Sequence, residues 1–127
     1  MPGAPLHPYR PSFTDLAKED ESNGHKILEV PLTICRLGFI NIPISGGFYI
    51  RSLPFPVLKA LIKKSFKGGC IVLYLHPWEI VPIAPRASLP LSSRFITYFN
   101  INSTISKLKN LLINFDFSTM EEIVDEF

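Results

Sequence analysis

One apolar run, from Cys70 to Leu75, constrains most strongly what this chain can fold into. Six apolar residues without a charge are typical of a β-strand that is buried on both faces, usually in a parallel sheet. Pro77 has no N–H for pairing and keeps the preceding residue extended, so the strand must end at His76. The sequence therefore predicts a central strand that brings His76, Trp78 and Glu79 to its carboxyl end, where α/β sheets and barrels bind ligands. A hydrogen-bonded structural histidine and a core tryptophan are the alternative interpretation of this pattern.

A helix is predicted directly before this strand, over residues 56–66. Leu58, Leu61 and Ile62 recur at helical spacing, and lysines occupy the opposite face. Gly68 and Gly69 end the helix, so helix, short loop and strand follow one another as in α/β folds. We also expect helices over residues 104–113 and from residue 118 onward, strands at 27–32, 37–44 and 115–117, and a long loop from 80 to 92. The glycines at 45–47 predict a tight loop or the close approach of a ligand, with a plain turn as the alternative.

The composition narrows the class of protein. A chain of 127 residues fits one domain, and 46% apolar with 19% charged residues indicates a folded protein. The net charge of +2 favours neither nucleic acid nor a membrane surface as partner. No stretch reaches the roughly 18 apolar residues of a membrane span, and no signal peptide is recognisable, so we expect a cytoplasmic location. Cys35 and Cys70 are isolated and predict buried free thiols.

The first 25 residues are predicted to form an extended arm and a loop. Prolines stand at every third position from 2 to 11, a spacing that favours a polyproline-like conformation over a helix. An acidic, polar stretch from Asp15 to Gly24 follows and reads as a surface loop.

No metal site is predicted in this chain. The three histidines, at positions 7, 25 and 76, have no ligand spacing, and neither an Asp-Asp pair after a strand nor a His-x-x-x-His motif occurs.

Several short segments of the chain occur in the same order as similar segments in a known family. They are Leu28–Thr33, Asn41–Pro43, Ser45–Arg51, Tyr74–Ile80, Pro85-Arg86, Ser93–Phe95, Tyr98–Asn100 and Leu111–Phe117. Together they resemble the C-terminal half of bacterial polysaccharide deacetylases of the NodB-homology type. The subgroup concerned is associated with exopolysaccharide production and carries a trailing domain of unknown function. The resemblance extends from about Pro2 to Val124.

The resemblance implies a fold and a chemistry. The family forms an incomplete (β/α) barrel, so we expect an α/β fold comprising the C-terminal half of such a barrel, as a single partial domain over residues 1–127. Its members remove acetyl groups from N-acetylated sugars with a divalent metal, usually zinc, held by an Asp and a His-x-x-x-His pair. By motif, His76 takes the role of the general acid that protonates the departing amine. Leu75, Trp78 and Tyr49 are then expected to bind substrate, with Glu79 and Arg86 as supporting residues.

Two functions remain open on this basis. In the first, the chain is the C-terminal portion of a metal-dependent deacetylase, inactive until joined to the half that carries the metal, with an N-acetylated polysaccharide as substrate. In the second, it is a stand-alone module that binds sugar or a partner through the region of Trp78, Tyr49 and Phe55. A neighbouring reading frame that encodes the missing motifs distinguishes the first function from the second.

Overall fold

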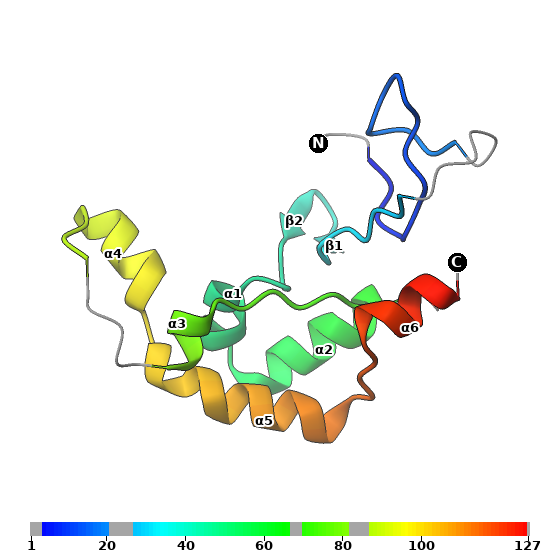
Figure 1. Ribbon diagram of the computed structural model, residues 1–127. Coiled ribbons are helices and arrows are strands. Elements are labelled where there is room, and N and C mark those ends of the chain that lie inside the picture. Colours follow the sequence, from blue (N-terminus) through cyan, green and yellow to red (C-terminus); the bar gives the residue numbers. More distant parts are fainter. Residues whose placement is uncertain (1–3, 21–26, 67–69, 82–86, 127) are drawn as a thin grey trace.

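The computed structural model describes residues 4–20, 27–66, 70–81 and 87–126 (Figure 1). Most of the regular structure is helical, and it follows an N-terminal arm and a short β-hairpin. In chain order the elements are β1 (Cys35–Leu37), β2 (Ile40–Ile42), α1 (Gly47–Ser52), α2 (Phe55–Ser65), α3 (Pro77–Ile80), α4 (Leu91–Tyr98), the 3₁₀ helix η2 (Ile101–Ser103), α5 (Thr104–Asn114) and α6 (Met120–Asp125).

The hydrophobic core is formed by residues of β1, α1, α2 and α5, and Figure 1 shows α2 and α5 below the stretched segment 70–76. Leu58 and Ile62 of α2 are buried against Leu111 of α5, and Cys35, Ile44 and Ile50 complete the cluster. Pro56 in the first turn of α2 costs no hydrogen bond, because the N–H groups there have no partner within the helix. The predictions of helices over 56–66 and 104–113 are thus confirmed, each within one residue of its observed ends. The final helix is also confirmed, although Thr119, rather than Ser118, forms its capping box with Glu122.

The predicted central strand is present only as a stretched segment with little pairing. Its single β-bridge is parallel and joins Tyr74 to Gly46. Tyr74 is 48% exposed, and Cys70 to Leu75 includes no fully buried residue, so the prediction of a strand buried on both faces is wrong for this structure. The physical reason is that α2 and α5 cover one face of the segment, while the described residues supply no second layer for the other. Cys70 is accordingly half-buried, whereas Cys35 is buried as expected.

Other predicted elements differ from the structure in ways that follow from local chemistry. The expected extended piece 37–44 is part of a hairpin, because Gly38 adopts a φ of 60° that reverses the chain between β1 and β2. The predicted glycine turn at 45–47 leads directly into α1, and the loop expected over 80–92 contains the start of α4. The segments predicted as strands at 27–32 and 115–117 are irregular apart from a bridge at Glu29. The predicted cap at Gly68 and Gly69 lies outside the described residues.

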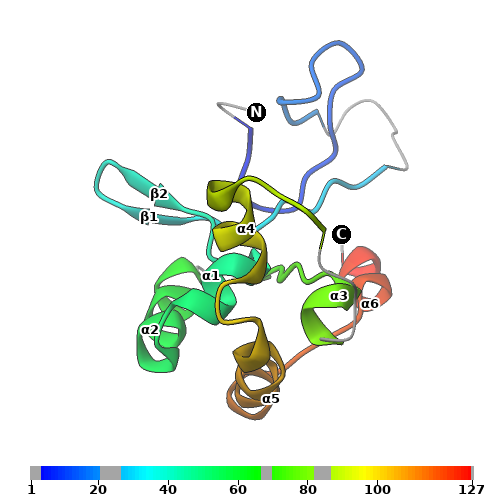
Figure 2. The same ribbon diagram turned by 90° about the vertical axis from the view of Figure 1, so that its left-hand side faces the viewer.

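The N-terminal arm, described from residue 4 to 20, contains bends, a turn and isolated bridges and no helix, and it is set apart from the helices (Figure 2). The polyproline-like conformation stays a prediction. Tyr9 is the anchor of the arm: it is 2% exposed, and its hydroxyl donates a hydrogen bond of 2.8 Å to the carbonyl oxygen of Leu16. Two main-chain hydrogen bonds of 3.0 and 2.9 Å pair Tyr9 with Glu29. The arm is therefore tied to the start of the body through one buried aromatic residue.

The partial (β/α) barrel stays a prediction. The two-stranded sheet β1–β2 is the sheet that the described residues contain, and they include no closed or open barrel. Within the same residues, no helix has both the length and the apolar character needed to cross a bilayer.

Candidate functional site

His76 stands at the point where the stretched segment ends and α3 begins. Its backbone is extended, with φ −86° and ψ 147°, and it forms the N-cap of α3. Pro77 then occupies the first position of the helix, which fixes where the helix starts. As the sequence predicts, the run ends at this histidine and presents it at the carboxyl end of the segment.

Aromatic side chains surround the imidazole of His76. The ring of Trp78 stacks on it at 5.5 Å between centroids and 18° between planes, and the ring of Tyr74 meets it edge-on at 4.7 Å. The hydroxyl of Tyr74 lies 3.4 Å from Nδ1 of His76. Tyr98 packs edge-on against Trp78 at 6.3 Å. The imidazole is half-buried, and these contacts hold its orientation with Nδ1 toward Tyr74.

A buried ion pair lies directly behind His76. Glu79 is 4% exposed and Arg51 is 1% exposed, and Nη1 of Arg51 donates to Oε1 of Glu79. The second carboxylate oxygen of Glu79 accepts a hydrogen bond of 2.8 Å from the main-chain N–H of His76. Glu79 was predicted to orient the imidazole; its carboxylate instead holds the main chain of His76 and so acts on the ring's position from behind.

The guanidinium of Arg51 binds three main-chain carbonyl oxygens besides Glu79. Nε donates to Phe99 at 2.7 Å, and Nη2 donates to Ile96 at 2.5 Å and to Thr97 at 2.9 Å. A buried charge is tolerated only when it is paired and its donors are satisfied, and Arg51 meets both conditions. The last turn of α4 is thereby fixed to α1 and α3.

The main chain of Arg51 is bonded as thoroughly as its side chain. Its carbonyl oxygen accepts hydrogen bonds from Nδ2 of Asn100 at 2.8 Å and from Nζ of Lys107 at 2.6 Å. Lys107 also donates to the carbonyl oxygen of Leu53 at 2.5 Å, and burial lowers the pKa of its ammonium group. We call Arg51, Glu79, Asn100 and Lys107 the polar hub, because they join α1, α3, α4 and α5 at one point.

Gly47 makes room for the carboxylate of the polar hub. A Cβ placed on Gly47 would lie 2.2 Å from Oε1 of Glu79, closer than such atoms approach. Glycine is therefore required at position 47 because another group approaches its Cα closely, as one interpretation of the sequence predicted. The approaching group is the carboxylate of Glu79 and not a ligand.

The structure brings some predicted site residues together and leaves others apart. Trp78 and Glu79 adjoin His76 as expected, and Leu75 packs its half-buried side chain against the core. Tyr49 lies on α1, and its described ring contact is with Phe48, at 5.4 Å between centroids, rather than with His76. Arg86 lies outside the described residues.

Arg51 and Tyr74 are the site residues that sequence reasoning missed. Arg51 belongs to the segment Ser45–Arg51, for which the family resemblance implies no role of the arginine, and its burial shows that it anchors the site. Tyr74 stands two positions before His76, the spacing that puts two side chains on one face of a strand, so alternation could have identified it.

The zinc or other divalent metal that the family resemblance implies does not fit the residues present here. Across the part of the chain that the structure describes, no three side chains of His, Cys, Asp or Glu gather in a way that could hold a metal ion. A catalytic zinc site needs about three protein ligands, so we assign no metal ligand to these residues and derive no step through a metal.

Comparison with known proteins identifies one family. A family model described as "Domain of unknown function (DUF3473)" matches residues 1–125. No curated protein and no solved structure matches the chain. The predicted resemblance is thus confirmed for a domain of unknown function over nearly the whole chain, while its connection to a deacetylase stays a prediction.

Proposed function

This chain belongs to the DUF3473 family, and we propose that it is the C-terminal portion of a metal-dependent deacetylase of N-acetylated polysaccharides. In this proposal its described residues supply the general acid and the aromatic surface beside it. The metal ligands belong to the segment that carries the Asp and His-x-x-x-His motifs. An arrangement of the whole as a partial (β/α) barrel is part of the same proposal.

The observation that carries the proposal is the rigid placement of His76. A general acid must be held within hydrogen-bond reach of the atom it protonates, and small displacements lower its efficiency. His76 is held from behind by Glu79, which is itself fixed by Arg51, and its ring is held by stacking on Trp78. A histidine with a purely structural role in a core has no need of a half-exposed ring.

The ring nitrogens then have different roles. Nδ1 faces the hydroxyl of Tyr74, so Nε2 is the nitrogen that remains for a substrate. As the tetrahedral intermediate collapses, the C–N bond breaks and the electron pair goes to the amine nitrogen. In the proposal His76 begins this step with a proton on both ring nitrogens. Nε2 gives its proton to the amine nitrogen, the ring keeps the proton on Nδ1 and becomes neutral, and the sugar leaves as a neutral amine.

Sugar binding without catalysis is the second candidate, and the half-buried Trp78 favours it. Aromatic faces such as the stacked pair of Trp78 and His76 provide a flat apolar surface with polar edges. This alternative predicts that the chain alone binds acetylated oligosaccharides and that adding a metal-bearing partner produces no hydrolysis.

The experiment is reconstitution with the segment that carries the metal motifs. We expect a fusion of this chain to that segment, taken from the DNA directly upstream, to release acetate from a chitin oligosaccharide, whereas neither part does so alone. A second fusion with His76→Gln keeps its metal content and loses activity. Acetate release by the upstream segment alone, at the rate of the fusion, would contradict the proposal.

A further inference from the structure

The stretched segment Cys70–Leu75 uses only one of its two main-chain edges. Tyr74 donates its N–H to the carbonyl oxygen of Ser45 at 2.8 Å, and Val72 donates its N–H to Oγ1 of Thr33 at 2.8 Å. Successive N–H groups of an extended chain point to opposite sides. The even-numbered residues therefore bond toward the segment 33–46, and Ile71 and Leu73 point their N–H groups away from it.

These outward N–H groups have no hydrogen-bond partner among the described residues, although Ile71 and Leu73 are half-buried. Main-chain donors that are withdrawn from water are nearly always paired in folded proteins, because leaving one unpaired costs about as much as a lost hydrogen bond. The arrangement is that of an exposed strand edge, which other strands pair with readily.

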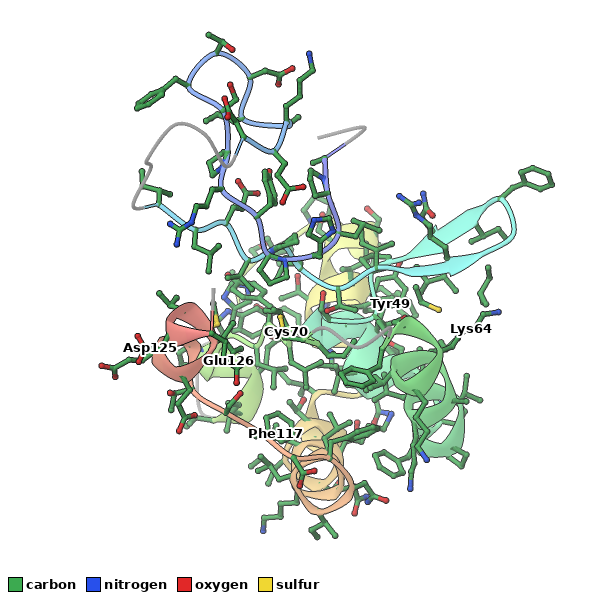
Figure 3. All side chains as sticks on the ribbon, turned by 90° about the vertical axis from the view of Figure 1, so that its right-hand side faces the viewer. Tyr49, Lys64, Cys70, Phe117, Asp125 and Glu126 are labelled. Carbon is green, nitrogen blue, oxygen red and sulfur yellow. The ribbon has the colours of Figure 1, made fainter. Side chains whose placement is uncertain are left out.

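A groove of about 590 Å³ lies along this edge. Its lining comes from Ile71 and Leu73, from residues of α2 and α5, from the irregular segment after α5, and from α6. Phe66 and Phe117 contribute apolar side chains that are 57% and 50% exposed. Figure 3 views the molecule from this side and shows Cys70, Phe117 and Glu126, which all line the groove. The lining is mainly apolar, and its charged residues are Asp116, Glu126 and, on α2, Lys63.

We propose that this groove binds one extended β-strand of a partner protein, with apolar side chains at alternate positions. The open N–H groups require carbonyl oxygens at strand spacing, which an extended main chain supplies, and the apolar lining accepts every second side chain. Basic residues at the ends of the strand would meet Asp116 and Glu126. The inference goes beyond the proposed function, since it does not depend on any role of His76.

A second copy of this chain fits the groove poorly. In a second copy the segment 70–75 also lies within a groove lined by α2 and α6. If the two segments approached each other, α2 and α6 of one copy would meet α2 and α6 of the other. Binding of a second copy is therefore an outcome that the experiment has to distinguish.

The experiment follows main-chain amide exchange by NMR in the full chain, with a capped peptide of sequence Lys-Thr-Val-Thr-Val-Thr-Val-Lys as probe. In the free chain we expect slow exchange at Val72 and Tyr74 and fast exchange at Ile71 and Leu73. The peptide should slow Ile71 and Leu73 about tenfold, the order expected for one added main-chain hydrogen bond. The same peptide with N-methyl groups on every residue has no edge that can pair and should give no protection.

Two matched variants locate the binding. Phe117→Lys should abolish the protection, and Phe95→Lys, an equally exposed phenylalanine on α4, should leave it unchanged. Slow exchange of Ile71 and Leu73 in the free chain would overturn the inference. So would equal protection by the N-methylated peptide, protection that grows with protein concentration in the absence of peptide, or protection confined to β1–β2.

Discussion

The two edges of the segment 70–76 differ in how completely their polar groups are satisfied. On the inner edge, Val72 and Tyr74 are hydrogen-bonded to the body, and behind the end of the segment the polar hub pairs a buried arginine with a buried glutamate. On the outer edge, the N–H groups of the half-buried residues Ile71 and Leu73 have no hydrogen-bond partner among the described residues, and both residues line the apolar groove. The polar groups behind His76 are thus satisfied within this chain, whereas the unpaired N–H groups beside the groove are the basis for the proposed partner strand.

Loss of the hub carboxylate should have the largest effect on stability. Glu79→Ala leaves the guanidinium of Arg51 buried without its counter-ion, and such a change costs about 3–5 kcal/mol. Asp116→Ala, which removes an exposed carboxylate beside the groove, should stay within about 0.5 kcal/mol. Urea unfolding of both variants gives the comparison, and equal losses would mean that the hub is no more important to the fold than the groove.

Two neighbouring leucines of α5 allow a comparison of the stability contributed by a buried and by an exposed side chain. Leu111 is fully buried and Leu112 is 53% exposed, so the helix propensity of the two positions is matched while their burial differs. Leu111→Ala should lower the free energy of unfolding by about 2–5 kcal/mol, and Leu112→Ala by less than about 1 kcal/mol. Thermal melts measure the two melting temperatures, and a lower value for Leu112→Ala than for Leu111→Ala would contradict the placement of Leu111 in the core.

Gly47→Ala should destabilise the chain even though alanine is the better helix former. The new Cβ would meet the carboxylate of Glu79, which cannot move without leaving Arg51, and overpacking of this kind costs about 1–3 kcal/mol. In the background of Glu79→Ala the obstacle is absent, so the same substitution should be nearly neutral there. A double-mutant cycle measures the difference, and full additivity would exclude the contact as the cause.

The N-terminal arm should be released at alkaline pH. Burial, and then the neighbouring carboxylates of Glu29 and Asp15, raise the pKa of Tyr9 above its ordinary value of 10.0. The folded arm holds this proton more tightly than the unfolded arm, so its stability is complete below that ordinary value and falls as the pH rises through the pKa of the folded state. Tyr9→Phe removes the hydrogen bond to Leu16, and it also removes the loss of arm stability between the ordinary and the folded-state pKa of the tyrosine. Limited proteolysis of the arm across that pH range measures both effects.

The parts of the fold that could be predicted from the sequence are those encoded within single elements. The periodic apolar residues and terminal proline of α2 defined it to within a residue, and the extended run was located correctly up to Pro77. α4 was missed because prolines suggested a loop, although Pro90 precedes it and Leu91 and Phe95 repeat at helical spacing. Burial of the run was overestimated because it depends on partner strands and on a second layer, which an apolar pattern does not specify.

The site was predictable in position but not in construction. The aromatic and acidic residues after the strand were correctly placed beside His76. The anchoring by Arg51 comes from a residue 28 positions away from Glu79, and no local pattern distinguishes a buried arginine from an exposed one. Glycine is required at position 47 because Glu79 of that same ion pair lies there, so this requirement could not be predicted from the local sequence either.

The most direct test of the account compares His76→Ala with wild type in the reconstituted enzyme, on an N-acetylated amino sugar and on an activated acetyl ester. An amine must be protonated to leave and an activated alcohol leaves unaided, so a general acid matters for the amide alone. We predict a loss of about 10²–10⁴-fold on the amide, a much smaller loss on the ester, and unchanged metal content. Equal losses on both substrates, with a lowered melting temperature, would contradict the acid role and leave His76 as a structural residue.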